Sequence, residues 1–301
     1  MNFFELHYAL EYYYMTTELH EEDTLSYFAK CKNESEVKSI AKKVMQMIDK
    51  KDILKVFKGL LLYHYLTQIE GRDFSIYFTD LKCTFEKKEK THLDSNSSQL
   101  SFWAQMYSAI LNQRLQFYKK YSFLNENFSI KKGKKLPLEF QNIESTEALE
   151  NDAFSLFGSL NAFVGKFLSK KTKNSYLEKA VEYCITDLIQ LLELITNLEN
   201  YKALLSGNQL QTELPLFCYS QIGIIKSEAE KTKQKIFKAT RIPKVTNYQK
   251  SVTKLNWFTY KFPIPTLNNT NNTISECFEE DNDVVTSHVV VNAICQALVL
   301  D

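Results

Sequence analysis

Apolar residues recur along much of this chain at the spacing of a helix. Over Glu34–Ile48 they fall every three or four positions, with lysines on the other side, which predicts an amphipathic helix. Over Asp52–Ile69 they fill most positions, which predicts a helix buried around most of its circumference. Over Tyr176–Leu205 they step alternately by four and three, as in helices packed nearly parallel in a bundle. Further helices are predicted over three more stretches: Gln99–Tyr121, with Ser95–Ser98 as its entry loop, Glu144–Leu168 and Asn208–Ala239.

The helical pattern stops beyond Phe262. Two prolines, the asparagine- and threonine-rich run Asn268–Thr273 and the acidic run Glu279–Asp283 follow. Such composition cannot bury enough apolar surface to order a chain, and it is typical of a flexible tail. We therefore expect a helical domain over residues 1–261 and a tail over residues 262–301.

Composition agrees with an all-helical fold and narrows the functional classes. The 301 residues include only 7 Gly and 5 Pro. A β-sandwich needs turn residues about every 8 to 12 positions, and a dinucleotide fold needs glycines at its phosphate turns, so both are disfavoured. Six widely spaced cysteines, no membrane-length apolar run and no basic leader favour a cytoplasmic protein.

Charge is distributed in blocks, although the net charge is only +1. Residues 1–29 carry six acidic residues and no Lys or Arg. All 37 basic residues lie in residues 30–261, together with 24 acidic ones, and the last 40 residues carry six acidic residues. The near-neutral total argues against a nucleic-acid binder, while the middle block offers basic surfaces.

Catalytic and metal-binding patterns are missing from the sequence. No two of the five histidines stand three or four residues apart, as a helical metal site requires. His64 and Arg114 fall inside apolar patterns. We predict a core histidine, with a base or ligand as the alternative, and an arginine paired with a carboxylate or helix-end carbonyls. We therefore expect no enzyme activity, cofactor or metal.

Several segments resemble the ENTH/ANTH superfamily. Lys55–Gly71 carries a Phe-Lys pair, an aliphatic run, His64 and a closing glycine, like the signature helix of that superfamily. Tyr107–Tyr121 resembles its helix of aromatic, leucine and arginine residues. Ile185–Leu192 and Thr232–Val245 resemble the last long helices of the larger ANTH domain. The resemblance extends roughly over residues 3–250.

The resemblance implies a clathrin assembly protein of the CALM type. Its fold is an ENTH/VHS-like helical solenoid continuing into a long-helix bundle, peripheral on clathrin-coated pits, vesicles or the plasma membrane. The family binds phosphatidylinositol 4,5-bisphosphate through lysines and a histidine in its first helices. The corresponding segment here, Glu18–Thr24, keeps only His20 for a phosphate contact.

Lipid binding is therefore either lost or moved to another basic surface. The candidates are a loop with Lys131, Lys132, Lys134 and Lys135, and a second loop with Lys170, Lys171 and Lys173. A solvated loop is the alternative in each case.

Partners beyond the membrane are predicted from the same resemblance. The closest match to a clathrin-binding motif is Leu298, Val299, Leu300 and Asp301, with a chain end or short helix as the alternative. The competing hypothesis for the whole protein is a lipid-independent helical scaffold that holds a SNARE or another partner helix. Other coat adaptors are further candidate partners.

Overall fold

The structure, a computed structural model, describes most of the first 231 residues. The described residues are 3–15, 28, 31, 33–49, 52–68, 74–78, 81, 95–125, 127–129, 137–140, 142–170, 174–206 and 213–231. All of them fall in the unit Met1–Arg241. Within these ranges the regular elements are seven α-helices and two 3₁₀ helices. They are α1 (Phe3–Met15), α3 (Glu34–Ile48), α4 (Ile53–Leu66), η1 (Phe74–Tyr77), α5 (Ser95–Lys120), η2 (Leu138–Phe140), α6 (Ile143–Lys170), α7 (Ser175–Ser206) and α8 (Glu213–Lys231).

The described elements confirm the all-α fold class. α3 has the predicted bounds, and α4, α6 and α7 agree with the predicted stretches to within three residues at each end. α8 lies inside the predicted stretch Asn208–Ala239. Pro215 falls in its first turn, where a missing backbone N–H costs no helical hydrogen bond. The predicted tail lies outside the described residues.

The start of α5 corrects one expectation. Ser95–Ser98, expected as an entry loop, forms the first turn of α5 instead. The first N–H groups of any helix lack intrahelical partners, so the polar residues that mark a loop also suit a first turn.

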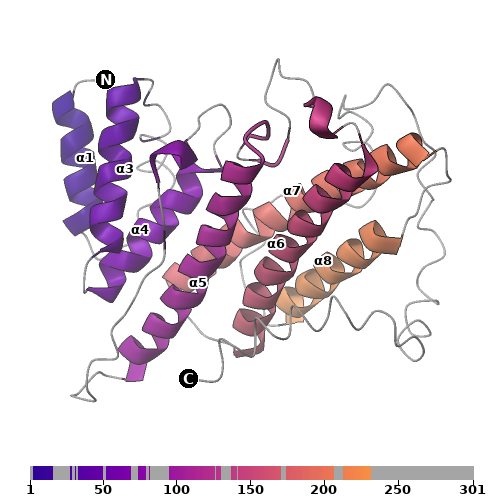
Figure 1. The fold of residues 1–301 in the computed structure, drawn as a ribbon. Helices are drawn as coiled ribbons and strands as arrows, with labels where there is room; N and C mark the ends of the chain where they lie inside the picture. The colour runs from indigo at the N-terminus through magenta and orange to yellow at the C-terminus, as the bar shows by residue number, and fades with distance from the viewer. Residues whose placement is uncertain are drawn as a thin grey trace. The chain divides into compact units, whose positions relative to one another are not determined.

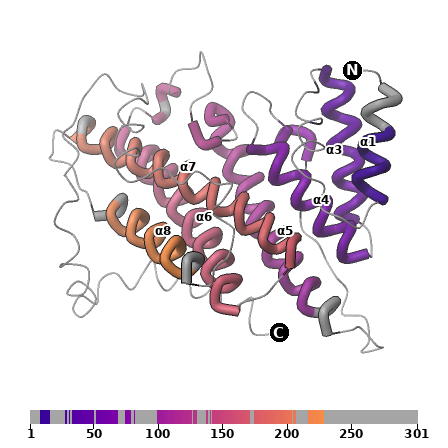
Figure 2. The backbone as a smooth tube through the Cα atoms, turned by 180° about the vertical axis from the view of Figure 1, so that it is seen from behind, coloured from indigo at the N-terminus to yellow at the C-terminus, as the bar shows by residue number. Residues whose placement is uncertain are grey.

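Short and long helices pack in chain order (Figures 1 and 2). α1 packs on α3, α3 on α4, and α4 on both α5 and α7. The long helices follow as neighbours, α5 with α6 and α6 with α7, and α8 contacts both α6 and α7. This order is that of a helical solenoid continuing into a long-helix bundle.

Ring contacts fix which helix ends meet. The Trp103 ring near the start of α5 lies 5.4 Å from the ring of Phe163, in the last two turns of α6. Tyr121, after the end of α5, lies 5.9 Å from Phe140, just before α6. α5 and α6 are therefore antiparallel, and the end of α6 lies beside the start of α5.

Polar caps and one glycine set the local geometry of the helices. The Asp52 carboxylate accepts a hydrogen bond from the Leu54 N–H at 3.0 Å and begins α4. The Asn174 side chain accepts from the Tyr176 N–H at 3.0 Å and begins α7 in the same way. At Gly59 of α4, an added Cβ would come within 2.9 Å of the Met47 Cβ, so the glycine permits the close approach of α3.

Candidate functional site

Of the residues predicted to contact lipid or clathrin, the structure describes only Lys170, which was expected in a loop and is the last residue of α6; Lys171 and Lys173 lie outside the described residues. The residues outside the described ranges are His20, Lys131, Lys132, Lys134, Lys135, Leu298, Val299, Leu300 and Asp301. Their roles stay predictions. In sequence, α1 ends at Met15 shortly before His20, and the four lysines fall in the connection between α5 and α6.

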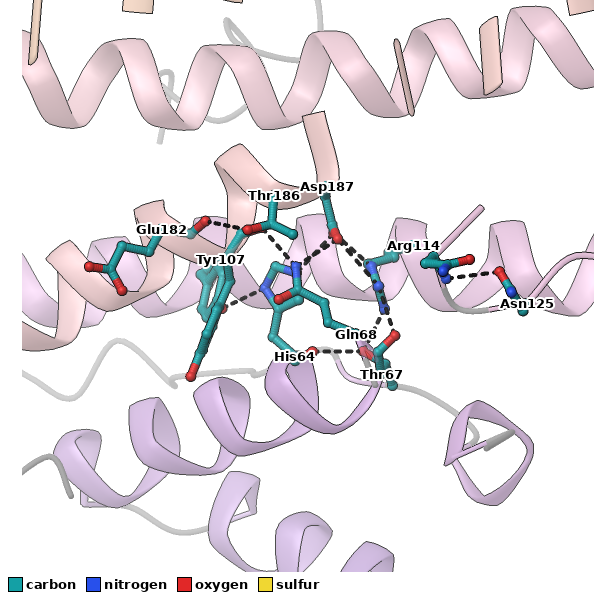
Figure 3. A network of polar contacts seen from close by, with 11 residues as sticks. His64, Thr67, Gln68, Tyr107, Arg114, Asn125, Glu182, Thr186 and Asp187 are labelled. Carbon is teal, nitrogen blue, oxygen red and sulfur yellow. Dashed lines mark hydrogen bonds and ion pairs between the residues drawn. The ribbon is translucent and has the colours of Figure 1, made fainter. Parts of the chain in front are cut away.

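A buried polar cluster joins α4, α5 and α7 (Figure 3). We call it the Asp187 cluster. Its members are His64, Thr67 and Gln68 at the end of α4, Tyr107 and Arg114 on α5, and Asp187 on α7. His64, Arg114 and Asp187 are fully buried.

Both oxygens of the Asp187 carboxylate accept two hydrogen bonds each. Oδ2 accepts from His64 Nε2 at 2.8 Å and from Arg114 Nε at 2.7 Å. Oδ1 accepts from Gln68 Nε2 at 2.8 Å and from Arg114 Nη2 at 3.3 Å. The four donors come from two helices, so one carboxylate on α7 holds α4 and α5 together.

The remaining donors of the cluster also have partners. Because Nε2 of His64 donates to a carboxylate, Nδ1 is the acceptor, and it receives the Tyr107 hydroxyl at 2.7 Å. Arg114 Nη2 donates to the Thr67 carbonyl oxygen at 3.0 Å, at the end of α4. The guanidinium also lies 4.8 Å from the Tyr118 ring centroid.

The electrostatics favour a neutral histidine and an ionised aspartate. Burial lowers the pKa of His64, and the opposing effect of Asp187 does not reverse that shift. Burial alone would raise the pKa of Asp187, but Arg114 and His64 outweigh it and hold that pKa below its usual range. The cluster is thus an Arg–Asp ion pair bridged by neutral donors.

The Asp187 cluster has a structural role. Its charged members have no contact with solvent, so they present nothing to a substrate. Both predictions for this region are confirmed: His64 is a core histidine, and Arg114 pairs with a carboxylate. Among the described residues no group of three His, Cys, Asp or Glu side chains is placed to hold a metal ion.

A second buried cluster joins α6, α7 and α8, and we call it the Glu150 cluster. Lys202 of α7 bonds Glu150 of α6 and lies 3.1 Å from Glu199. Two carboxylates facing one ammonium carry excess negative charge if both are ionised. Burial first and Glu199 second raise the pKa of Glu150 to about 8, against the effect of Lys202. Cys218 of α8 faces this group, and burial raises the pKa of its thiol to about 12.

Two lysine–aromatic groups lie on the outer parts of the helices. Near the end of α1, the ammonium groups of Lys43 and Lys55 each lie 4.4 Å from the Tyr14 ring centroid. Near the end of α6, Lys166 lies 4.5 Å and Lys170 5.6 Å from the centroid of Phe102 on α5. Tyr14, Phe102 and Lys166 are only partly buried, and Lys170 is exposed, so both groups are open to solvent.

A scan against protein-family models matches the ANTH domain over residues 18–198. The match covers more than half of the chain and includes the whole Asp187 cluster. The chain belongs to the ANTH domain family. ANTH domains are non-enzymatic adaptors of endocytosis that associate peripherally with phosphoinositide membranes. A comparison with curated proteins gives no match.

Membership in the ANTH family confirms the resemblance drawn from the signature helix. No helix among the described residues combines the length and apolar character needed to cross a bilayer. The predicted end of the domain at residue 261 lies beyond both the matched stretch and the described residues, and it stays a prediction.

Proposed function

We propose that this ANTH protein is an adaptor of clathrin-mediated endocytosis that attaches to membranes containing phosphatidylinositol 4,5-bisphosphate. Family membership over residues 18–198 carries the proposal. The excess of basic over acidic residues across residues 30–261 supports it, because anionic lipid attracts such a surface. The protein would act in the cytoplasm, on coated pits, coated vesicles or the plasma membrane.

In this proposal the family lipid site near the first helices is degenerate. His20 is its only remaining phosphate donor, and four acidic residues surround it in Glu18–Thr24. Binding then depends on other basic surfaces. One candidate is the loop with Lys131, Lys132, Lys134 and Lys135. The other is the connection from α6 to α7, with Lys170, Lys171 and Lys173. The residues Leu298, Val299, Leu300 and Asp301 would add a clathrin contact.

Vesicle sedimentation tests the membrane part of the proposal. The full chain should sediment with vesicles that contain the bisphosphate, and less so as salt rises, because exposed charges are screened. Phosphatidylcholine vesicles serve as the control. Glu21→Lys should strengthen binding, since it removes one acid and adds one base beside His20. Absence of sedimentation with bisphosphate-rich vesicles at low salt would remove lipid binding from the proposed function.

A lipid-independent scaffold is the second candidate function. The acidic first 29 residues favour it, because an anionic leaflet repels them. α8 also exposes two apolar side chains, Leu216 and Ile224, which suit a partner helix such as that of a SNARE. Pull-down with SNARE helices and coat adaptors in detergent-free buffer separates the candidates, because a scaffold keeps its partner without a membrane.

A further inference from the structure

The two lysine–aromatic groups differ in their counter-ions. Around Tyr14, Lys43 pairs with Glu11 and Lys55 lies 3.9 Å from Asp52. Around Phe102, neither Lys166 nor Lys170 has a carboxylate partner among the described residues. A lysine paired with a carboxylate adds little to the local field, whereas an unpaired one attracts anions from solution.

The sequence around the second group strengthens this difference. Between Asp152 and Glu178 the chain carries four lysines and no acidic residue. Lys166 and Lys170 are the two that the structure describes, and they lie in the last two turns of α6. The positive charge at this helix end therefore has no nearby acid in sequence to offset it.

The aromatic ring gives the group an amphipathic character. Phe102 lies in the second turn of α5, half-buried, with its ring against both ammonium groups. The adjacent Trp103 is fully buried against α6 and fixes the backbone that carries Phe102. Phenylalanine beside lysines is a combination found in helices that lie at a membrane interface.

Contacts also place this group at the end of the fold where α1 stops. The Tyr14 ring lies beside Lys55 in the first turn of α4. Phe57, just after that turn, lies 6.2 Å from the ring of Tyr176 at the start of α7. The start of α7 follows the end of α6 after four residues. The helix preceding the family lipid segment thus ends on the same side as Lys170.

The competing lysine loop lies outside the described residues, and the helix ends that it connects in sequence are not the ones near Lys170. It connects the end of α5 to the start of α6 in sequence, whereas Lys170 is the last residue of α6. α6 has 28 residues, which corresponds to a helix about 42 Å long. A membrane plane perpendicular to α6 at its end would therefore not reach the start of that helix.

We propose that Lys166, Lys170 and Phe102 form the contact of this protein with anionic lipid membrane. We call this surface the α6 patch. The proposal rests on the proposed membrane function and identifies the surface that carries it out. The lysines attract the leaflet and the ring enters the headgroup region. The contact is electrostatic and graded by lipid charge, without a pocket for one headgroup.

The test compares charge-matched variants of the full chain in vesicle binding at low salt. The vesicles contain phosphatidylcholine, phosphatidylserine and phosphatidylinositol 4,5-bisphosphate. Each lysine near an anionic surface contributes about 1 kcal/mol, so Lys166→Gln with Lys170→Gln should weaken binding about 30-fold. The matched control is Lys42→Gln with Lys226→Gln, two exposed lysines on α3 and α8, and it should change binding less than about threefold.

Two further variants test the role of charge and the competing loop. Lys166→Arg with Lys170→Arg keeps both charges and should keep wild-type binding. A quadruple glutamine variant of Lys131, Lys132, Lys134 and Lys135 tests the competing loop. Soluble inositol hexakisphosphate should compete weakly, because a membrane surface rather than a headgroup pocket supplies the affinity.

The outcomes assign failure to distinct parts of the reasoning. If the wild type binds vesicles but the double glutamine variant of the α6 patch matches its control, the patch is overturned and the proposed function stands. If only the loop variant loses vesicle binding, the patch is likewise overturned and the proposed function stands. If the wild type binds no vesicle of any composition, the proposed membrane function fails, and the patch fails with it.

Discussion

Asp187→Asn is the sharpest test of what holds the three central helices together. The substitution keeps the shape of the side chain and removes its charge. Both carboxylate oxygens accept from two N–H donors each. An amide has only one oxygen, so in either orientation its NH₂ group faces two donors, and Arg114 stays buried without a counter-charge.

The expected loss is large because the cluster is fully buried. Removing one partner of a buried ion pair costs about 3–5 kcal/mol, since the other charge stays uncompensated. Two hydrogen bonds are also lost, at about 1 kcal/mol each, within that range. We expect Asp187→Asn to lower the free energy of unfolding by about 3 kcal/mol or more at pH 7, measured by urea unfolding followed by circular dichroism.

A control and a second variant make the test specific. Asp152 pairs with the exposed Lys120 at 2.7 Å and accepts a hydrogen bond from the Tyr121 hydroxyl at 2.7 Å. An amide oxygen can keep the hydroxyl bond, so Asp152→Asn should cost less than about 1 kcal/mol. Arg114→Met combined with Asp187→Asn should cost at least about 2 kcal/mol less than the sum of the single changes. If Asp187→Asn costs no more than Asp152→Asn, the carboxylate does not hold these helices and the account of the cluster is wrong.

The pH dependence of the same variant has a defined sign. The pKa of Asp187 lies below its usual value in the folded protein, because Arg114 and His64 outweigh the effect of burial. Its contribution is therefore present above the unfolded-state pKa and is lost as pH falls through the folded-state value. Asp187→Asn should remove that acid-side loss, so the stabilities of the variant and the wild type should approach each other as pH falls below about 4.

Two further predictions concern helix packing and the Glu150 cluster. Gly59→Ala should destabilise the protein by about 1–3 kcal/mol, because its Cβ would meet the Met47 Cβ at 2.9 Å. Gly165→Ala, whose Cβ would have nothing within 4 Å, should stabilise the protein by about 0.5–1 kcal/mol. Equal effects of the two substitutions in thermal unfolding would contradict the close approach of α3 and α4. The pKa of Glu150 is raised to about 8 in the folded protein, so its contribution is full below the unfolded-state pKa and is lost as pH rises through 8. Glu150→Gln should therefore match the wild type below about pH 4 and exceed it by about 2 kcal/mol or more at pH 9. Glu147→Gln, at an exposed position of α6, is the control variant. A wild-type profile flat from pH 5 to 9 would refute the raised pKa.

Helices with a regular apolar stripe could be predicted from sequence, because burial of that stripe stabilises them. α3 has the predicted bounds. α1 shows why a helix without such a stripe could not be predicted. Tyr12, Tyr13 and Tyr14 are consecutive, so the apolar residues of α1 surround the helix and leave no periodic face. Only the packed structure shows that Tyr13 is buried while Tyr12 is exposed.

The Asp187 cluster could be predicted only in part. His64 and Arg114 stand inside apolar stripes, and a buried polar group needs a partner, so the sequence implied that partners exist. It did not identify them, because Asp187 lies 73 residues from Arg114 and 123 from His64. One signal was present: Asp187 is an acidic residue next to Leu188 in the most regular apolar seam of the chain.

Counting charges did not locate a membrane surface, because a count does not separate neutralised lysines from available ones. The basic excess over residues 30–261 includes Lys202 in the Glu150 cluster and Lys38 and Lys120 in surface ion pairs. The carboxylate partners of those lysines neutralise their charge, so they contribute little to the attraction of a distant anionic surface. The lysines available to an anionic surface are those without a nearby acid, and Lys166 and Lys170 at the end of α6 meet that condition in sequence. Membrane affinity in this family member should therefore follow the placement of acidic residues more closely than the number of lysines.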